Sequence, residues 1–147
     1  MSDIQPTLKY LESFKVTGLT LQTRNSDEFN EKTAKLPKLW QQFLASALAS
    51  EAKLFEVYSD FESDAEGLYT VTLGVKDGER EGFSTVIIQA GNYLVFQGSG
   101  PMPASVVETW NTIWQYFKTS MEFQRNFLSD FEMYTDVENV EIYIGIN

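Results

Sequence analysis

Hydrophobic residues recur at helical spacing in two segments of the chain. The spacing i, i+3, i+4, i+7 occurs at Leu36, Leu39, Trp40 and Phe43 and again at Trp110, Ile113, Trp114 and Phe117. Such spacing places all four side chains on one face of an amphipathic helix. Pro37 suits a first helical turn, and Ser105 followed by Glu108 is typical of a capping box that opens a helix. We therefore predict two amphipathic helices, offset by 74 positions from Leu36 to Trp110.

Short runs rich in aromatic and β-branched residues surround both predicted helices and indicate β-strands. Three pairs of runs occupy matching places, at residues 15–23 and 92–97, 55–58 and 131–134, and 68–73 and 140–144. The middle pair repeats the pattern Phe-Glu-X-Tyr, which begins at Phe55 and again at Phe131. Each half of the chain is therefore predicted to form strand, helix, strand, strand.

Two related halves predict one domain, because neither half has enough strands to cover its helix and both faces of a sheet. We expect an α+β fold over residues 1–147, with duplicated βαββ halves at about residues 8–76 and 83–147. The halves should form an antiparallel sheet with two main helices, pseudo-two-fold symmetry and a central cleft where they meet. The charged segment 76–82 is interpreted as a hairpin or linker and the polar segment 25–33 as an exposed loop.

The composition removes several classes of site. The sequence has no cysteine and no histidine, which excludes disulfides, thiolate nucleophiles, imidazole bases and metals held by those residues. The acidic residues of segment 60–66 alternate as carboxylate ligands could, but a solvated loop is the favoured interpretation. We therefore expect no metal and no cofactor.

The net negative charge of the chain indicates which classes of binding partner are favoured. The chain has 11 basic and 21 acidic residues and a formal charge of -10 at pH 7. This charge disfavours direct binding to nucleic acid or an anionic membrane and favours cationic partners, although solubility alone is the simpler reason for net acidity. No run approaches the ~20 apolar residues of a membrane span, and residues 1–10 lack an export signal, so a cytoplasmic location is expected.

The order and spacing of many short motifs carry a family resemblance. In the first half they are Gly18, Thr23, Asn25, residues 36–43, Tyr58, Tyr69, Thr70 and Gly74. In the second half they are residues 90–96, Gly100, Pro101, Trp110, residues 131–134 and residues 140–144. From about Leu8 onward the chain resembles the GyrI-like effector-binding family, which includes domains fused to AraC-type and MerR-type transcription regulators. Because no helix-turn-helix segment is evident, it resembles the stand-alone branch, some members of which are encoded on integron gene cassettes.

The resemblance implies a cleft that binds lipophilic, often cationic, drug-like molecules. It also implies a ligand-facing glutamate in the second half, which by motif position is Glu132. In a strand, the side chain of Tyr134 lies on the same face as that of Glu132. We expect the ligand-binding residues to be Glu132, Tyr134, Tyr143, Trp110, Tyr69 and Tyr58.

A flat, delocalised cation suits such a cleft because it is weakly hydrated and costs less to bury than a compact ammonium. Each favourable aromatic ring adds cation–π attraction of roughly 0.5 to 2 kcal/mol. Glu56 is expected to be only an exposed duplicate of Glu132. Four further residues are expected to pack the helices onto the sheet rather than to contact ligand, namely Trp40, Ile113, Trp114 and Phe117.

Three functions stay open at this point. The first is a sequestering or sensing module for hydrophobic cations. The second is a hydrolase of strained cyclopropane rings, in which Glu132 would activate water and a nearby tyrosine would donate a proton. The third is binding to gyrase or to another protein. A homodimer and a separate transcription regulator are both open as partners.

Overall fold

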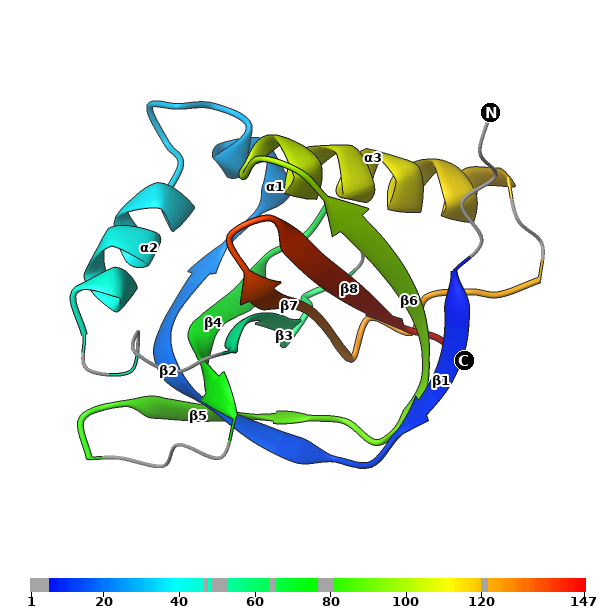
Figure 1. The fold of residues 1–147 in the computed structure, drawn as a ribbon, viewed down its shortest axis with the longest axis horizontal. Coiled ribbons are helices and arrows are strands. Elements are labelled where there is room, and N and C mark those ends of the chain that lie inside the picture. Colours follow the sequence, from blue (N-terminus) through cyan, green and yellow to red (C-terminus); the bar gives the residue numbers. More distant parts are fainter. Residues whose placement is uncertain (1–5, 47, 49–52, 64–65, 77–80, 120–121) are drawn as a thin grey trace.

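The computed structural model describes residues 6–46, 48, 53–63, 66–76, 81–119 and 122–147. In this part of the chain eight strands join in one curled antiparallel sheet, and three helices accompany it (Figure 1). The strands are β1 (Thr7–Leu11), β2 (Phe14–Thr23), β3 (Leu54–Ser59), β4 (Tyr69–Lys76), β5 (Ser84–Ile88), β6 (Gly91–Ser99), β7 (Ser129–Asp136) and β8 (Asn139–Gly145). The helices are α1 (Asn25–Glu28), α2 (Leu36–Leu44) and α3 (Ala104–Thr119). The predicted α+β class with an antiparallel sheet is confirmed.

The strand order shows the duplication directly. The sheet runs β1-β6-β8-β7-β3-β4-β2-β5, with a pseudo-two-fold axis between β7 and β3. On either side of that axis, β7 corresponds to β3, β8 to β4, β6 to β2 and β1 to β5. The first strand of each half pairs with the second strand of the other half, since β1 pairs with β6 and β5 pairs with β2. The two halves are therefore interlocked at both edges of the sheet.

Two segments between elements bear on the sequence prediction. Of the two interpretations of segment 76–82, a hairpin that pairs β4 with β5 is excluded, because β2 lies between these strands in the sheet, and the linker is not contradicted; residues 77–80 lie outside the described residues. Helix α3 begins at Ala104, so Ser105 lies within its first turn and its hydroxyl contacts the Met102 sulfur at 3.0 Å. The predicted capping box is therefore wrong. The edge strands β1 and β5 and the short helix α1 were not predicted.

A close approach of two strands explains the glycines of the first-half motif. Gly18 of β2 is paired with Gly74 of β4. A β-carbon on Gly18 would lie 1.7 Å from the carbonyl oxygen of Leu73, and one on Gly74 would lie 2.1 Å from that of Thr17. Any larger residue at either position would therefore force the two strands apart.

The core divides between the two faces of the sheet. One face carries a cluster rich in aromatic residues, in which Phe131 stacks on Tyr143 with ring centroids 4.4 Å apart. On the other face α2 packs through Phe43 on β4, and α3 packs through Ile113 on β6 and β8. The central strands β3 and β7 lie between these two helical clusters. The side chains of β3 and β7 on the helical face are therefore not covered by either cluster and can form a site.

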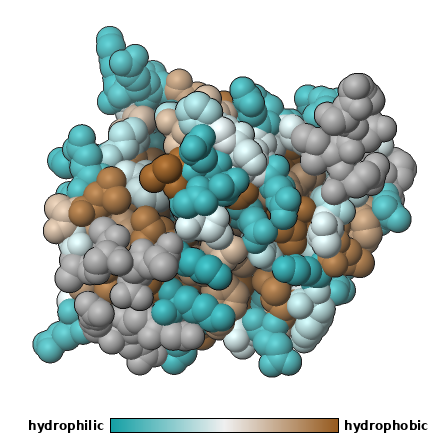
Figure 2. All heavy atoms as spheres, viewed as in Figure 1, coloured by the Kyte–Doolittle hydropathy of each residue, from teal (hydrophilic) through white to brown (hydrophobic). Residues whose placement is uncertain are grey.

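The surface is mixed in character. On the face shown in Figure 2, hydrophobic residues form several separate groups among hydrophilic ones. Exposed large hydrophobic side chains include Leu8 and Tyr10 on β1 and Ile87 on β5, the two edge strands. None of the helices in the described residues is long and apolar enough to cross a membrane.

Truncating the aromatic stack is expected to destabilise the fold strongly. Phe131 is 2% exposed, so Phe131→Ala should lower the free energy of unfolding by about 3 to 5 kcal/mol through lost burial and the resulting cavity. Urea denaturation followed by circular dichroism would measure this. Val137→Ala is the control, because Val137 is 83% exposed and its truncation should change stability by less than about 0.5 kcal/mol. Equal effects of the two substitutions would contradict the assignment of this core.

Candidate functional site

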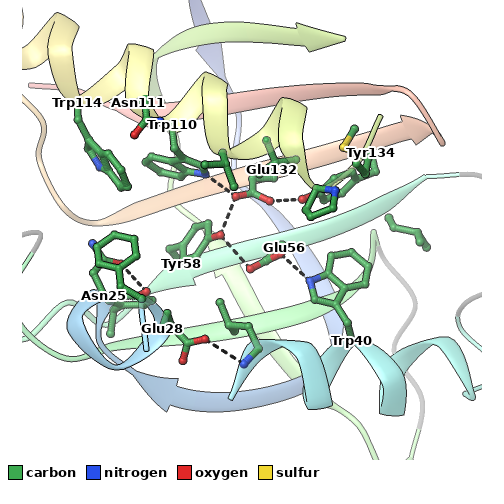
Figure 3. A pocket seen from close by; sticks show the side chains of 18 of the residues that line it. Asn25, Glu28, Trp40, Glu56, Tyr58, Trp110, Asn111, Trp114, Glu132 and Tyr134 are labelled. Carbon is green, nitrogen blue, oxygen red and sulfur yellow. Dashed lines mark hydrogen bonds between the residues drawn. The ribbon is translucent and has the colours of Figure 1, made fainter. Parts of the chain in front are cut away.

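A cavity of about 860 Å³ lies over the central strands, between α2 and α3 (Figure 3). Its wall is mostly aromatic, with contributions from both halves of the chain. The aromatic residues that line it are Phe29, Trp40, Tyr58, Phe61, Tyr69, Trp110, Trp114 and Tyr134. Cavities of this size that are lined by apolar side chains and a few polar groups are typical of small-molecule sites.

Glu132 lies at the floor of the cavity, and its side chain is almost fully buried, at 1% exposure. Three donors hold its carboxylate. The indole N–H of Trp110 donates to Oε2 at 2.6 Å, the hydroxyl of Tyr58 donates to Oε2 at 2.7 Å, and the hydroxyl of Tyr134 donates to Oε1 (Figure 3). A buried carboxylate is tolerated when it is hydrogen-bonded in this way. Its position is therefore fixed before any ligand arrives.

Glu56 is the counterpart of Glu132 and is equally enclosed. The two residues are directly opposite each other in the antiparallel pairing of β3 with β7. Glu56 is 3% exposed and accepts a hydrogen bond from the indole N–H of Trp40 at 3.0 Å. Its Oε2 lies within hydrogen-bonding distance of the Tyr58 hydroxyl oxygen, at 2.9 Å. The expectation that Glu56 is an exposed duplicate is wrong, because strand β3 is central and its helical face lies beneath the cavity.

The helices contribute their indoles in a symmetrical manner. Trp40 and Trp110 each donate to the glutamate of their own half and pack edge-on against the tyrosine of the other half. The ring centroids of Trp40 and Tyr134 are 5.4 Å apart, and those of Trp110 and Tyr58 are 5.6 Å apart. The four rings thus surround the two carboxylates, and their contacts join the two halves of the chain.

Burial dominates the proton equilibria of this cluster. It raises the pKa of Glu56 well above the ordinary value, and the neighbouring charge of Glu132 raises it further. Burial also raises the pKa of Glu132, while the hydrogen bonds from Tyr134, Tyr58 and Trp110 oppose that rise. The pKa values of both tyrosines are raised well above normal by burial and by the carboxylates. The tyrosines therefore remain neutral donors.

The segment 25–33 is largely exposed, as predicted, but it begins with a short helix. It contains α1, and the carboxylate of Glu28 accepts hydrogen bonds from the backbone N–H groups of Lys35 and Leu36 at the start of α2. The hydroxyl of Tyr69 donates to the Asn25 side chain at 2.7 Å. Because Asn25, Glu28 and Phe29 all line the cavity, this segment forms one of its walls.

The charges around the cavity are mostly negative. Glu28, Glu56, Glu132 and Asp136 line it, and Arg125 is the single basic residue among the described residues of the lining. Arg125 is held in an ion pair with the fully buried Asp130 at 2.7 Å and lies over the Phe127 ring at 4.4 Å. Its charge is therefore already balanced, and it does not neutralise the two glutamates.

The structure brings together five of the six residues predicted to bind ligand. Glu132, Tyr134, Trp110, Tyr69 and Tyr58 all line the cavity. Their role in binding stays a prediction.

Tyr143 lies elsewhere, and its placement in the cleft is corrected. It pairs with Phe131, whereas Glu132 pairs with Ile142, so Tyr143 points to the opposite face of the sheet. There its hydroxyl donates to Glu141 at 2.9 Å.

Sequence reasoning also missed residues of the cavity. Trp40 and Trp114 were expected to serve only as core, but both line the cavity, whereas Ile113 is buried in the core as expected and Phe117 packs there against Phe96. The offset of 74 positions aligned Trp40 with Trp114. The hydrogen bonds instead make Trp110 the structural counterpart of Trp40, because each of these two indoles donates to the glutamate of its own half. The Phe-Glu-X-Tyr repeat was the signal for Glu56, since it placed the two glutamates at matching positions in the strands.

A duplicated βαββ sheet with a ligand-sized cavity over its central strands defines an effector-binding domain. The family described as Cass2, integron-associated effector binding protein, matches residues 7–146. The chain therefore belongs to this family.

Individual relatives agree with this assignment. The protein named "Putative transcriptional regulator protein YobU" of Bacillus subtilis (strain 168) is 32% identical over 157 aligned positions, which cover 95% of this chain and 96% of that protein. The integron cassette protein VCH_CASS2 from the mobile metagenome of Vibrio cholerae is 30% identical, with a TM-score of 0.89 over 97% of this chain and 96% of that one. SAV2435, solved with tetraphenylphosphonium bound, has a TM-score of 0.74 at 15% identity, over 97% of this chain and 94% of that one, and shares the fold.

The raised pKa values predict how stability depends on pH. A buried acid whose folded pKa exceeds its unfolded pKa binds more protons in the folded state, so stability falls as pH rises between the two values. Above about pH 5 the unfolding free energy of the parent should decrease as pH rises. In Glu56→Gln the slope of this decrease should be smaller by up to about 1.4 kcal/mol per pH unit. Urea denaturation over a pH series would measure the slope.

The matched control for this slope is Glu108→Gln, which removes the same charge from an exposed position on α3. It should leave the slope of the parent protein nearly unchanged. A parent and a Glu56→Gln variant with the same slope would show that Glu56 does not titrate abnormally.

Proposed function

We propose that this protein is an effector-binding module that binds hydrophobic cations in the cavity, with Glu132 as the counter-charge. The observation that carries the proposal is a buried carboxylate, held by three donors, at the floor of an aromatic cavity. Among the described residues of the lining, the basic side chain, Arg125, is paired with Asp130, so the charge of Glu132 has no basic partner there. A cation that fills the cavity supplies the missing charge.

The physical balance favours large, delocalised cations. Such ions are weakly hydrated, so the cost of removing them from water is small compared with that of a compact ammonium. The faces of Trp40, Trp110 and Trp114 offer cation–π attraction, and exclusion of water strengthens their interaction with the charge. The acidic lining and the formal charge of -10 also attract cations from solution.

The comparisons support the proposal at the level of ligand class. SAV2435 shares the fold and was solved with tetraphenylphosphonium, a bulky hydrophobic cation. The relationship to YobU, a protein named as a transcriptional regulator, supports a role in sensing an effector.

The contacts of Glu132 favour binding over hydrolysis. A carboxylate that activates water needs a free lone pair directed at that water. Three of the four lone pairs of the Glu132 carboxylate already accept hydrogen bonds, from Tyr58 and Trp110 at Oε2 and from Tyr134 at Oε1, so only one on Oε1 is left for a water. The carboxylate is thus arranged to be a fixed charge. The aromatic cavity also fits a small molecule better than a protein partner such as gyrase.

Binding of tetraphenylphosphonium, compared with tetraphenylborate, tests the proposal. The two ions have similar shape and opposite charge, so the cation should bind and quench tryptophan fluorescence from the cavity while the anion should bind at least about tenfold more weakly. Glu132→Gln should weaken binding of the cation by about tenfold or more, because the counter-charge is removed. Fluorescence titration at pH 7 would measure both affinities.

The control for that titration is again Glu108→Gln, which lowers the net negative charge by the same amount outside the cavity. It should bind the cation as the parent does. Circular dichroism would establish that each variant is folded. Equal affinity of the folded Glu132→Gln variant and the parent would exclude Glu132 as the counter-charge, and tight binding of tetraphenylborate would contradict the selection for cations.

A further inference from the structure

The hydroxyl of Tyr58 lies between the two glutamates. Its oxygen is 2.9 Å from Oε2 of Glu56 and 2.7 Å from Oε2 of Glu132 (Figure 3). A tyrosine hydroxyl carries one proton and donates one hydrogen bond. Two ionised carboxylates cannot both accept that proton. The second contact is a hydrogen bond only if one of the carboxyl groups carries a proton of its own and donates it to the tyrosine oxygen.

The number of donors indicates which glutamate holds that proton. Glu132 has two donors besides Tyr58, namely Trp110 and Tyr134. Among the residues that the structure describes, Glu56 has one such donor, Trp40. Fewer donors stabilise the ionised form less, and the raised pKa of Glu56 agrees in direction. The chain of hydrogen bonds therefore runs from a protonated Glu56 to Tyr58 and from Tyr58 to an ionised Glu132.

The other ionisable groups of the cavity do not remove the need for this proton. Tyr58 on β3, Tyr69 on β4 and Tyr134 on β7 are neutral, because burial raises their pKa values. Glu28 beside α1 and Asp136 at the end of β7 add only negative charge.

The remaining charged group is Arg125, which precedes β7 and is paired with Asp130. The helices contribute uncharged indoles from Trp40 and Trp110. Among the described residues of the lining, nothing compensates two ionised glutamates at once.

We propose that Glu56, Tyr58 and Glu132 form an adjustable counter-charge, which holds one proton in the empty cavity and releases it to solvent when a ligand with two positive charges binds. The proposal rests on the proposed function. A single cation is matched by ionised Glu132 alone, and Glu56 keeps its proton. A second cationic centre stabilises ionised Glu56, so its O–H bond breaks, the electron pair stays on the carboxylate, and the proton leaves to water.

The symmetry of the site favours such a ligand. Each glutamate has an indole donor from the helix of its own half, and each half contributes aromatic wall to a cavity of about 860 Å³. A ligand with two cationic centres therefore meets two acids, one on either side of the Tyr58 hydroxyl, each with an indole donor of its own. The class implied is the flat aromatic dication, and Glu56 is the residue that determines this specificity.

Proton release on binding tests the proposal. The probes are methyl viologen, a two-ring dication, and N-methyl-phenylpyridinium, a two-ring cation with one charge fewer. Neither probe titrates, so any proton comes from the protein or the buffer. Calorimetric titrations at about pH 6, above the ordinary pKa of glutamate, in two buffers of different ionisation enthalpy measure the protons released per ligand. We expect about one proton for the dication and almost none for the single cation.

Variants identify the source of the proton. Glu56→Gln should abolish proton release and weaken binding of the dication, relative to that of the single cation, by about tenfold or more. If this variant does not fold, infrared spectra of the parent replace it, because a protonated carboxyl has a distinct C=O stretching band. That band should be present in the empty protein, disappear with methyl viologen and persist with N-methyl-phenylpyridinium.

The outcomes separate this inference from the proposed function. If the single cation binds but methyl viologen does not, or binds without proton release, the adjustable counter-charge is excluded while cation binding stands. Equal release by both probes also excludes it, because Glu56 would then respond to any cation. If neither these probes nor tetraphenylphosphonium bind, the proposed function fails and this inference fails with it.

Discussion

The structure depends on two carboxylates buried directly opposite each other across β3 and β7. Ionised groups at such close range repel and lose hydration, so they persist only when donors surround them. Those donors come from both layers of the fold, since Trp40 and Trp110 descend from the helices and Tyr58 rises from the sheet. The helices therefore lie at a distance from the sheet at which an indole N–H can donate to a carboxylate on the central strands.

This arrangement explains why a cavity is present in the middle of the domain. Phe43 and Ile113 seal each helix onto the strands of its own half, but neither helix extends over the pseudo-two-fold axis. Aromatic rings and polar oxygens fill the floor there and leave the space above it open. A protein that used aliphatic residues on β3 and β7 would bring the helices together and have no site.

Much of the architecture was predictable from the periodicity of the chain, and parts of the site were not. The repeated spacing around Trp40 and Trp110 and the recurring Phe-Glu-X-Tyr pattern define the helices, the central strands and the duplication, and the position of Glu132 followed from resemblance. Tyr143 was misplaced because alternation along a strand shows only which of its residues share a face, not which face of the sheet that is. The pairing of Phe131 with Tyr143 decides this, and it places Tyr143 on the face opposite the cavity. The burial of Glu56 was missed because the sequence of the first half does not show that β3 pairs with β7 of the second half and so becomes a central strand.

The exchange of edge strands has a consequence for how the chain acquires its shape. Thr7 is registered with Val95, so the amino-terminal strand has no neighbour until more than half of the polypeptide has left the ribosome. Long sequence separations of this kind slow the search for native pairings. Because each half supplies the edge strand of the other, neither half could complete its four strands as a separate unit, and folding of the two halves is coupled.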